Sequence, residues 1–239
     1  MSAFISAELQ DKLDQTIHVL NVAKADYPNL VLANSLGAED VVLTDLISKY
    51  APGIQMFCLD TGRLPEETLK LLAEIEKKYN THIDIYYPEA QPLQQFVKTH
   101  GINAFYESAE LRKACCQVRK LEPLARALQG KDAWITGLRK EQSVTRSDVT
   151  FVEWDAGNDL YKVNPLIEWT EKEVWDYIRA YKVPYNALHD QHYPSIGCAP
   201  CTRAISAGED VRAGRWWWEN PESKECGLHP VSQLNQSAT

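Results

Sequence analysis

Residues 29–47 read Asn29-Leu-Val-Leu-Ala-Asn-Ser-Leu-Gly-Ala-Glu-Asp-Val-Val-Leu-Thr-Asp-Leu-Ile47. The apolar run at 29–34 predicts a short buried strand, and residues 41–47 predict a helix. The small residues between them, Ser35-Leu-Gly-Ala-Glu-Asp40, predict a turn whose free backbone N–H groups point at an anion. A single glycine turn after a strand is commonly only a connection, so this turn indicates an anion site only together with other features.

The same alternation of strand and helix continues along the chain. Strands are predicted at 54–59, 82–87 and 132–136, and helices at 6–26, 65–78, 93–100 and 108–128. This order predicts an α/β fold with a doubly wound, mostly parallel sheet. Ligands of such sheets bind beyond the carboxyl ends of the strands. We therefore expect one crevice to be formed by residues 35–40, 60–62 and 137–146.

The last third of the chain has a looser pattern. A hairpin is predicted from residues 150–154 and 160–163, and a helix over 168–181. From Pro184 on, proline, glycine and polar residues dominate, apart from a short helix near Cys201. We interpret 1–239 as a single domain, with an N-terminal helix within about 1–28, an irregular C-terminal segment and a mobile tail at about 205–239.

Composition excludes several classes of protein. The chain has 239 residues, 44% of them hydrophobic and 24% charged, which is ordinary for a soluble globular domain. Its N-terminal residues do not form a secretory signal, and no apolar run approaches the ~20 residues of a membrane helix. We expect a cytoplasmic protein without a membrane partner, in which a homo-oligomer is possible.

Charge along the chain is uneven. The net charge of −8 argues against broad binding of nucleic acid. Between Arg112 and Arg146, however, Lys and Arg clearly outnumber Asp and Glu. Two interpretations fit this basic segment equally well: a solvated helix face, or a pocket for a compact polyanion.

Four of the six cysteines form two tight pairs, Cys115/Cys116 and Cys198/Cys201. In a reducing compartment such pairs indicate metal ligands or redox groups. Four thiolates suit zinc or an iron–sulfur cluster. Adjacent residues on a helix point ~100° apart, which favours a cluster of several iron atoms over one small ion. Zinc remains an alternative, and Cys198-Ala-Pro-Cys201 also looks like a redox dithiol, although that interpretation leaves Cys115 and Cys116 unexplained.

The two remaining cysteines differ in their surroundings. Cys58 lies in an apolar strand and is interpreted as a buried, inert thiol. Cys226 lies in a polar stretch close to Lys224 and His229, which favours exposure and a lowered pKa. It is therefore the candidate nucleophile, with an ordinary tail cysteine as the alternative.

Residues 208–219 have unusual chemistry for a tail. Arg212 and Arg215 precede three consecutive tryptophans at 216–218. The arginines could clamp phosphate or sulfate oxygens, or stack on neighbouring aromatic rings. The tryptophans must pack on something, either to anchor the tail or to hold the arginines above the crevice.

At this point the chain resembles the assimilatory adenylylsulfate (APS) reductases, the iron–sulfur branch of the APS/PAPS reductase family, from about residue 35 to 229. The motifs that carry the resemblance are Ser35-Leu-Gly-Ala-Glu-Asp40, Leu59-Asp-Thr-Gly62, Lys113-Ala-Cys-Cys-Gln-Val-Arg-Lys120, Gly137-Leu-Arg-Lys-Glu-Gln-Ser-Val-Thr-Arg146, Cys198-Ala-Pro-Cys201, Glu209-Asp-Val-Arg-Ala-Gly-Arg-Trp-Trp-Trp218 and Glu225-Cys-Gly-Leu-His229. Each motif is modest evidence, but their order and combination are highly specific.

The resemblance implies a fold, an activity and a set of site residues. The fold would be an adenine-nucleotide α-hydrolase-like sheet, and the activity the reduction of APS to sulfite and AMP with thioredoxin as reductant. A [4Fe-4S] cluster would be held by Cys115, Cys116, Cys198 and Cys201. Cys226 would take the sulfonate as an S-sulfocysteine. The implied substrate-binding residues are Ser35, Gly37, Asp40, Leu59, Thr61, Lys120, Gly137, Arg146, Arg212, Arg215 and His229.

The chain differs from some members of the family in its first loop and in the source of its reductant. Some relatives carry two serines in the first loop, whereas this chain has Ser35 followed by Leu36-Gly37, so which hydroxyl contacts which oxygen is open. Plant members append a thioredoxin-like domain, and this sequence stops at Thr239, so the expected reductant is a separate protein.

Alternatives to an APS reductase remain at this stage. A PAPS reductase would use the same chemistry on a 3′-phosphorylated substrate, and the cysteine pairs favour APS. An RNA-thiolating enzyme would require ATP and RNA, and a zinc-binding module would be non-catalytic. We also hypothesise that Lys120, one turn beyond Cys116, lies between an anionic cluster and an anionic substrate and couples them electrostatically.

Overall fold

The computed structural model describes residues 5–142 and 149–220, and its core is one six-stranded sheet. The strand order is β3-β2-β1-β4-β6-β5. The bounds of the strands are Leu30–Ala33 for β1, Gln55–Leu59 for β2, Asp84–Tyr86 for β3, Ala133–Ile135 for β4, Val152–Asp155 for β5 and Leu160–Val163 for β6. All strands predicted from the sequence are therefore present, with ends that differ by at most two residues.

The pairing of the strands is mostly parallel. β1 pairs in parallel with β2 and β4, β2 with β3, and β4 with β6. Only the hairpin β5–β6 is antiparallel. The predicted doubly wound, mostly parallel sheet is thus confirmed, and the predicted hairpin extends this sheet instead of standing apart from it.

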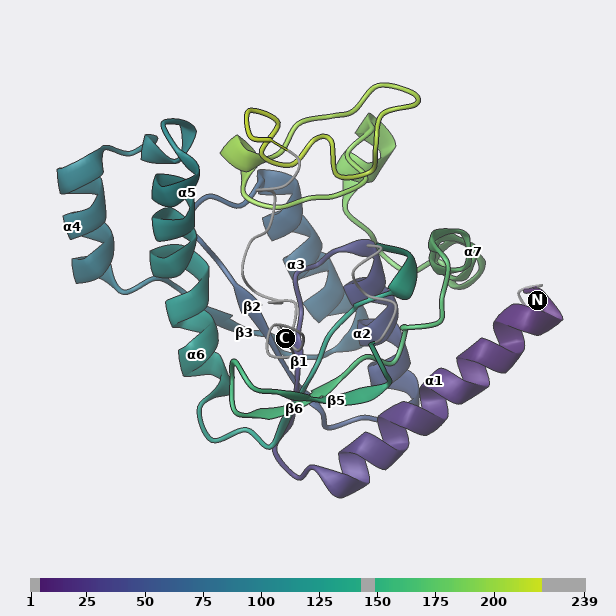
Figure 1. Cartoon of the computed structure of the whole chain (residues 1–239). Helices are drawn as coiled ribbons and strands as arrows, with labels where there is room; N and C mark the ends of the chain where they lie inside the picture. Colours follow the sequence, from purple (N-terminus) through teal and green to yellow (C-terminus); the bar gives the residue numbers. More distant parts are fainter. Residues whose placement is uncertain (1–4, 143–148, 221–239) are drawn as a thin grey trace, which may run out of the picture.

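Helices cover both faces of the sheet (Figure 1). One face packs against α1 (Ala7–Asp26), α2 (Ala38–Tyr50), α3 (Glu66–Tyr79) and α7 (Glu171–Tyr181). The other packs against α6 (Glu122–Leu128). Because side chains alternate along a strand, Leu32 faces the first layer and Val31 the second.

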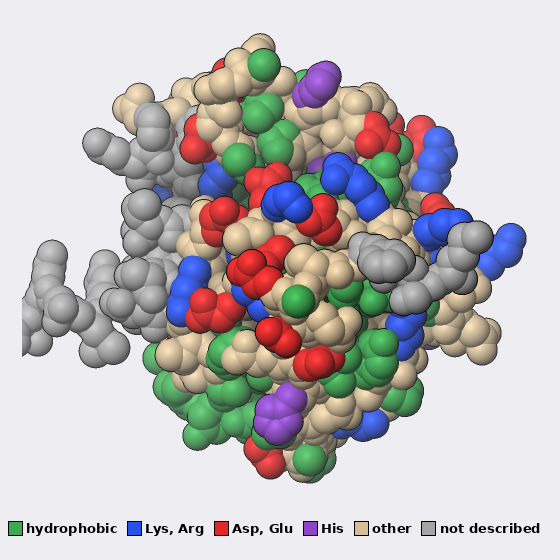
Figure 2. All heavy atoms as spheres, turned by 90° about the vertical axis from the view of Figure 1, so that its right-hand side faces the viewer, with side chains coloured by type: hydrophobic (Ala, Val, Ile, Leu, Met, Phe, Trp, Pro, Cys, Tyr) green, Lys and Arg blue, Asp and Glu red, His purple; other side chains and the backbone are tan. Residues whose placement is uncertain are grey.

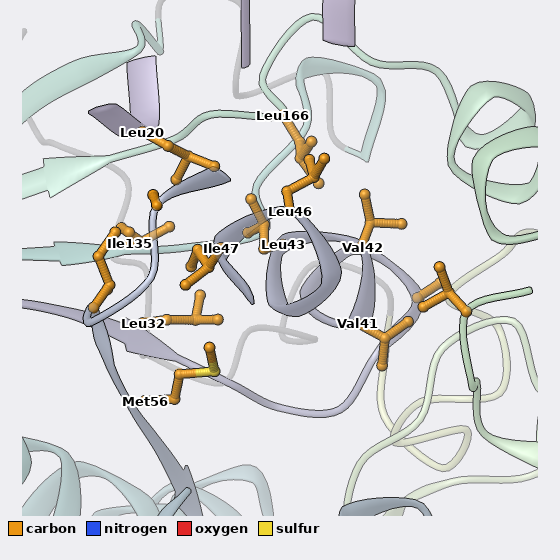
Figure 3. Packing of buried hydrophobic residues seen from close by; sticks show 14 of the residues in the cluster. Leu20, Leu32, Val41, Val42, Leu43, Leu46, Ile47, Met56, Ile135 and Leu166 are labelled. Atoms are coloured by element: carbon orange, nitrogen blue, oxygen red, sulfur yellow. The ribbon is translucent and has the colours of Figure 1, made fainter. Parts of the chain in front are cut away.

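Helix α2 is the centre of the larger core. Figure 3 shows side chains pointing outward from α2 in several directions: Leu43 and Ile47 towards the side of α1, β1, β2 and β4, Leu46 towards Leu166, and Val41 and Val42 to the opposite side of the helix. A helix that is apolar nearly all round is buried nearly all round. This burial fixes the start of α2, and with it the turn that precedes the helix.

One buried carboxylate ties α2 to its neighbours. Asp45 accepts hydrogen bonds from the hydroxyls of Tyr177 at 2.6 Å and Tyr79 at 2.9 Å, and pairs with Lys49 at 2.6 Å. Three donors offset the cost of burying the charge. The network locks α2 against α3 and α7 behind the site.

The single helix predicted over 108–128 is in fact three segments. α5 (Ala109–Cys116) is followed by a π-helical turn (Gln117–Leu121) and then by α6. π-turns rotate the residues that follow them and occur often at functional sites. Arg119 and Lys120 lie in this turn, so a regular helix would aim them differently.

The C-terminal segment is irregular, as predicted. From residue 184 to 220 the described chain has two short 3₁₀ helices, Ala187–Gln191 and Ala199–Cys201, and an isolated bridge between Thr202 and Arg215. α4 (Ala90–His100) lies beside α5 at the edge of the molecule (Figure 1).

The surface mixes both signs of charge. On the face that carries α7 and the N-terminal end of α1, acidic and basic side chains are interspersed (Figure 2). Among the helices that the structure describes, none has the length and apolar character of a membrane-crossing segment.

Candidate active site

A cavity of about 590 Å³ lies beyond the carboxyl ends of β1, β2 and β4. The three segments expected to converge there do so, as far as they are described. Of the predicted substrate-binding residues, the cavity wall contains Ser35, Gly37, Asp40, Leu59, Thr61, Lys120, Gly137 and Arg212. The volume suits a nucleotide-sized ligand.

The turn between β1 and α2 forms the floor of the cavity. Asp40 accepts hydrogen bonds on Oδ2 from the Ser35 backbone N–H at 2.7 Å and from the Ser35 hydroxyl at 2.6 Å. Gly37 precedes α2 without a side-chain cap. The N-terminus of α2 therefore presents backbone N–H groups and the positive end of its dipole to the cavity, as an anion site requires.

Gly137 closes the other side of this turn. A Cβ at residue 137 would come within 2.4 Å of Asp40 Oδ1, so only glycine allows β4 and α2 to approach this closely. Burial raises the pKa of Asp40 to about 6, although its hydrogen bonds from Ser35 oppose the shift. The floor of the cavity thus contains a carboxyl that titrates near neutrality.

Only some cations of the basic segment between Arg112 and Arg146 line the large cavity. Arg139 is buried and pairs with Glu39 at 2.8 Å and Glu141 at 2.8 Å. Arg112 is buried and paired with Glu219 at 2.9 Å. Arg112 and Arg139 therefore hold the structure together through ion pairs, and Arg139 and Lys120 both line the large cavity.

The four paired cysteines meet in a second, small cavity. Cys115 and Cys116 come from the end of α5, and Cys198 and Cys201 flank the 3₁₀ helix Ala199–Cys201. Cys198 Sγ lies 3.2 Å from the Thr61 hydroxyl. Convergence of two pairs so distant in sequence supports their interpretation as one ligand set.

The chemistry of this cysteine cavity fits a metal cluster. Burial raises the pKa of Cys201 to about 12 and also raises that of Cys115, so these thiols remain protonated unless a cation or metal takes the proton's place. In residues 5–142 and 149–220, no three His, Cys, Asp or Glu side chains converge on a single metal-ion position. The four thiols line one small cavity, and four cysteine thiolates are the donor set that an iron–sulfur cluster or a zinc ion uses.

Arg119 lies between the two cavities. Its Nη1 donates to the Thr61 carbonyl at 2.6 Å, and its Nε is buried without a partner in the described part of the chain. Arg119 and Lys120 both line the cysteine cavity, and Lys120 lines the large cavity as well. Lys120 therefore lines both cavities; that it lies between a cluster and a substrate and couples them electrostatically stays a prediction.

Arg212 and Arg215 occupy different positions. Arg212 lines the large cavity, whereas Arg215 lies behind the wall formed by residues 195–197. Arg215 stacks on Trp216 at 4.7 Å, and a Cβ at Gly197 would come within 2.3 Å of its Nη2. The stacking predicted for these arginines is therefore found for Arg215, which supports the wall of the cavity.

Sequence reasoning missed His189 and Trp175. Both line the large cavity, with ring centroids 5.0 Å apart. The two ring nitrogens of His189 are buried and have no hydrogen-bond partner among the described residues, and burial lowers the pKa of the ring. Neither residue belongs to a motif, so only the fold brings them to the site.

Three predicted residues lie outside the described chain: Arg146, Cys226 and His229. The roles expected for them stay predictions. Cys58, by contrast, is buried in β2, as predicted, at the wall of the large cavity, and burial raises its pKa to about 12, which disfavours the reactive thiolate.

Solved structures similar to this chain define its class. FMN adenylyltransferase from Candida glabrata, in complex with FAD and inorganic pyrophosphate, has a TM-score of 0.59 at 14% identity and covers 95% of this chain and 80% of its own. NMN synthetase from Francisella tularensis has a TM-score of 0.54 at 14% identity, over 76% and 73% of the two chains. At 14% identity these two structures share with this chain the class of fold alone, a mostly parallel α/β sheet covered by helices.

Within that class, the chain belongs to the phosphoadenosine phosphosulfate reductase family, whose domain profile matches residues 29–204. A relative from Allochromatium vinosum, named adenosine 5′-phosphosulfate reductase, is 58% identical over 89% of this chain and 83% of its own. A relative of the same name from Burkholderia cepacia is 48% identical over 94% and 90%. The phosphate complex of phosphoadenylyl-sulfate reductase from Candida auris has a TM-score of 0.68 at 28% identity, over 86% and 100%.

Proposed function

We propose that this protein reduces adenylylsulfate (APS) to sulfite and AMP in sulfate assimilation. One observation carries the proposal: a nucleotide-sized cavity and a cavity lined by four cysteines share Lys120 in their walls. The names of the relatives, at up to 58% identity, support this activity. We expect the reaction to take place in the cytoplasm, where thiols stay reduced.

The chemistry requires a nucleophile and fixed cations. In this proposal the Cys226 thiolate attacks the sulfur of the sulfate group, the bond from that sulfur to the bridging oxygen breaks, and AMP leaves with the electron pair. The product on the enzyme is an S-sulfocysteine. Lys120 and Arg212 lower the barrier by stabilising the charge that moves onto AMP, and loss of one such donor costs roughly 3 kcal/mol.

A second step returns the enzyme to its starting state. A thiolate of a separate dithiol protein, thioredoxin by resemblance, attacks Cys226 Sγ, and sulfite leaves with the electron pair of the broken S–S bond. The second thiol of the reductant then resolves the mixed disulfide and releases the Cys226 thiolate. The dithiol is oxidised by two electrons, and the sulfate sulfur is reduced to sulfite.

We infer that Cys115, Cys116, Cys198 and Cys201 hold a [4Fe-4S] cluster. A bound cluster would supply an anionic, redox-capable group beside Lys120. The chain's own residues bring the two sites together, because the π-turn carries Lys120 from the cysteine-bearing end of α5 to the wall of the large cavity.

A PAPS reductase is the second candidate, because the family description refers to phosphoadenosine phosphosulfate. The two are separated by kcat/KM on APS and PAPS, measured through sulfite release. We expect a clear preference for APS, and a preference for PAPS would overturn the assignment of substrate.

The proposal is tested by an APS-dependent sulfite assay combined with iron and acid-labile sulfide analysis. We expect brown protein that contains both elements and releases sulfite and AMP in equal amounts. Cys226→Ser should keep the colour and nucleotide binding but release no sulfite. Substantial turnover by Cys226→Ser would refute the nucleophile, and colourless protein with one zinc and no sulfide would refute the cluster.

A further inference from the structure

Three apolar side chains are left exposed next to the cysteine cavity: Ile102, Tyr106 and Trp217, which are 59%, 43% and 39% exposed. We call them the aromatic patch. Ile102 and Tyr106 lie just before α5, and Trp217 lies near the end of the described chain. The rings of Tyr106 and Trp217 are 6.3 Å apart, so these two residues, distant in sequence, form one surface. Ile102 is linked to them through Arg63, which donates to the Ile102 carbonyl and lies over the ring of Phe105, 4.6 Å from the ring of Tyr106.

The aromatic patch rests on a rigid base. Tyr106 packs on Trp218 at 4.5 Å between ring centroids, and its hydroxyl donates to the Pro200 carbonyl at 2.8 Å. Arg63 donates to the Ile102 carbonyl at 3.1 Å and lies over the ring of Phe105 at 5.2 Å. A surface held this firmly loses little entropy when a partner binds it.

The core does not require these side chains to be apolar. Phe105 and Trp216 are 1% exposed and already cover the cysteine cavity from this side. Exposed aromatic side chains grouped in one place mark interaction sites more often than isolated ones do. Tryptophan, tyrosine and arginine are also the residues that dominate binding energy at protein interfaces.

The aromatic patch lies close to the anchor point of the proposed nucleophile. Trp217 is three residues before Asn220, where the description of the chain ends, and Cys226 is six residues after it. Six residues of extended chain span at most about 20 Å. A protein that reacts with Cys226 must therefore come within that distance of Asn220, and the aromatic patch, which includes Trp217, lies within the same range.

We propose that the aromatic patch is the docking surface for the small dithiol protein that releases sulfite from Cys226. This inference rests on the proposed function, because it concerns the partner of the same site. A reductant that must bind and leave in every cycle needs a small, transient interface, of the size that one exposed cluster of aromatic side chains provides. Docking there would place the attacking thiolate within reach of Cys226 Sγ.

The test compares two reductants on the same variants. Ile102→Asp places a charge in the aromatic patch at its most exposed position, and Trp217→Ser removes its largest ring. With thioredoxin as reductant we expect kcat/KM for thioredoxin to fall at least about tenfold in both variants. With dithiothreitol, which needs no docking surface, turnover should match that of the unaltered protein.

A matched control is available on β5, the edge strand of the sheet at the end opposite β3. Trp154 on β5 is 51% exposed, and Trp154→Ser should leave the kinetics with thioredoxin unchanged. Formation of the S-sulfocysteine is followed separately, by intact mass after APS is added without reductant. Unaltered thioredoxin kinetics in Ile102→Asp and Trp217→Ser, or an equal loss with dithiothreitol, would overturn the docking surface alone. Unaltered protein that forms no S-sulfocysteine would overturn the proposed function, and the docking surface with it.

Discussion

At the scale of single residues, Asp40 sets a pH dependence on binding. Burial raises its pKa to about 6, so Asp40 is mostly ionised at pH 7 and mostly protonated at pH 5. The ionised carboxylate repels an anion at the start of α2, and protonation removes that repulsion. We therefore expect APS affinity to rise roughly fivefold as the pH falls through 6, equivalent to about 1 kcal/mol.

This prediction is measured as APS binding to Cys226→Ser protein, which does not consume the ligand. The sulfate and phosphate groups of APS do not titrate near pH 6, so the ligand adds no slope of its own. In Asp40→Asn the slope should disappear. The same slope in Asp40→Asn would assign it to another group.

A second prediction at the scale of single residues concerns Gly197. In Gly197→Ala the new Cβ displaces the Arg215 guanidinium from its place behind the cavity wall. We expect KM for APS to rise about tenfold, or ~1.4 kcal/mol, with the cluster retained. Gly130→Ala is the control: its surroundings are open and its φ of +71° makes it mildly strained, so it should lose some stability but no APS affinity. An unchanged KM in Gly197→Ala would show that Arg215 does not shape the site.

At the scale of secondary-structure elements, one buried ion pair joins α5 to the end of the described chain. Arg112 and Glu219 are almost fully buried and make two hydrogen bonds of 2.9 Å. Glu219→Gln leaves a buried guanidinium without its counter-charge. We expect a loss of about 3 kcal/mol in the free energy of unfolding, measured by denaturant titration.

Two controls make that measurement specific. Arg112→Met combined with Glu219→Leu should recover most of the loss, because an apolar pair has no charge to leave unpaired. Glu66→Gln breaks the exposed pair Glu66–Lys70 on α3 and should leave stability unchanged. Equal effects of Glu66→Gln and Glu219→Gln would contradict the argument from burial.

Elements were the features most readily predicted from the sequence. The apolar runs at β1, β2 and β4 are short and bounded by turn residues, so periodicity alone locates them. The π-turn was not predicted; α5 before it contacts residues 104–106, whereas α6 after it contacts β2 and β3. The ion pair of Arg139 with Glu39 was also hidden, because these residues become neighbours only when the chain is folded. The same holds for the place of Arg215 behind Ser195 and Ile196, whereas its stacking on the adjacent Trp216 was predicted.

At the scale of the whole molecule, the cysteine cavity lies where α5 meets the irregular C-terminal segment. α5 carries one pair of cysteines and the irregular C-terminal segment the other. Removal of a bound cluster should therefore loosen residues 195–220 and leave the sheet intact. We expect hydrogen exchange after chelation to speed up in that segment and around α5, with protection in β1, β2 and β4 unchanged. Uniform loss of protection would indicate that the cluster supports the whole fold.

The candidate site was partly predictable at this scale. The motifs located the anion turn, the four cysteines and Lys120, because each is a local combination of residues with its own chemistry. His189 and Trp175 carry no such combination, and their place at the cavity follows from the packing of α7 and the 3₁₀ helix Ala187–Gln191.

The distance in sequence between the two cysteine pairs has a consequence for biosynthesis. During translation Cys115 and Cys116 emerge with α5, well before β6 and α7, whereas Cys201 follows both of these elements. Domains fold largely as their N-terminal parts emerge, so the sheet can assemble while only half of the ligand set exists. A cluster held by these cysteines, as proposed, would therefore be inserted late, into a nearly finished protein. In that case cells short of iron should accumulate a folded, colourless precursor that iron–sulfur assembly can still activate.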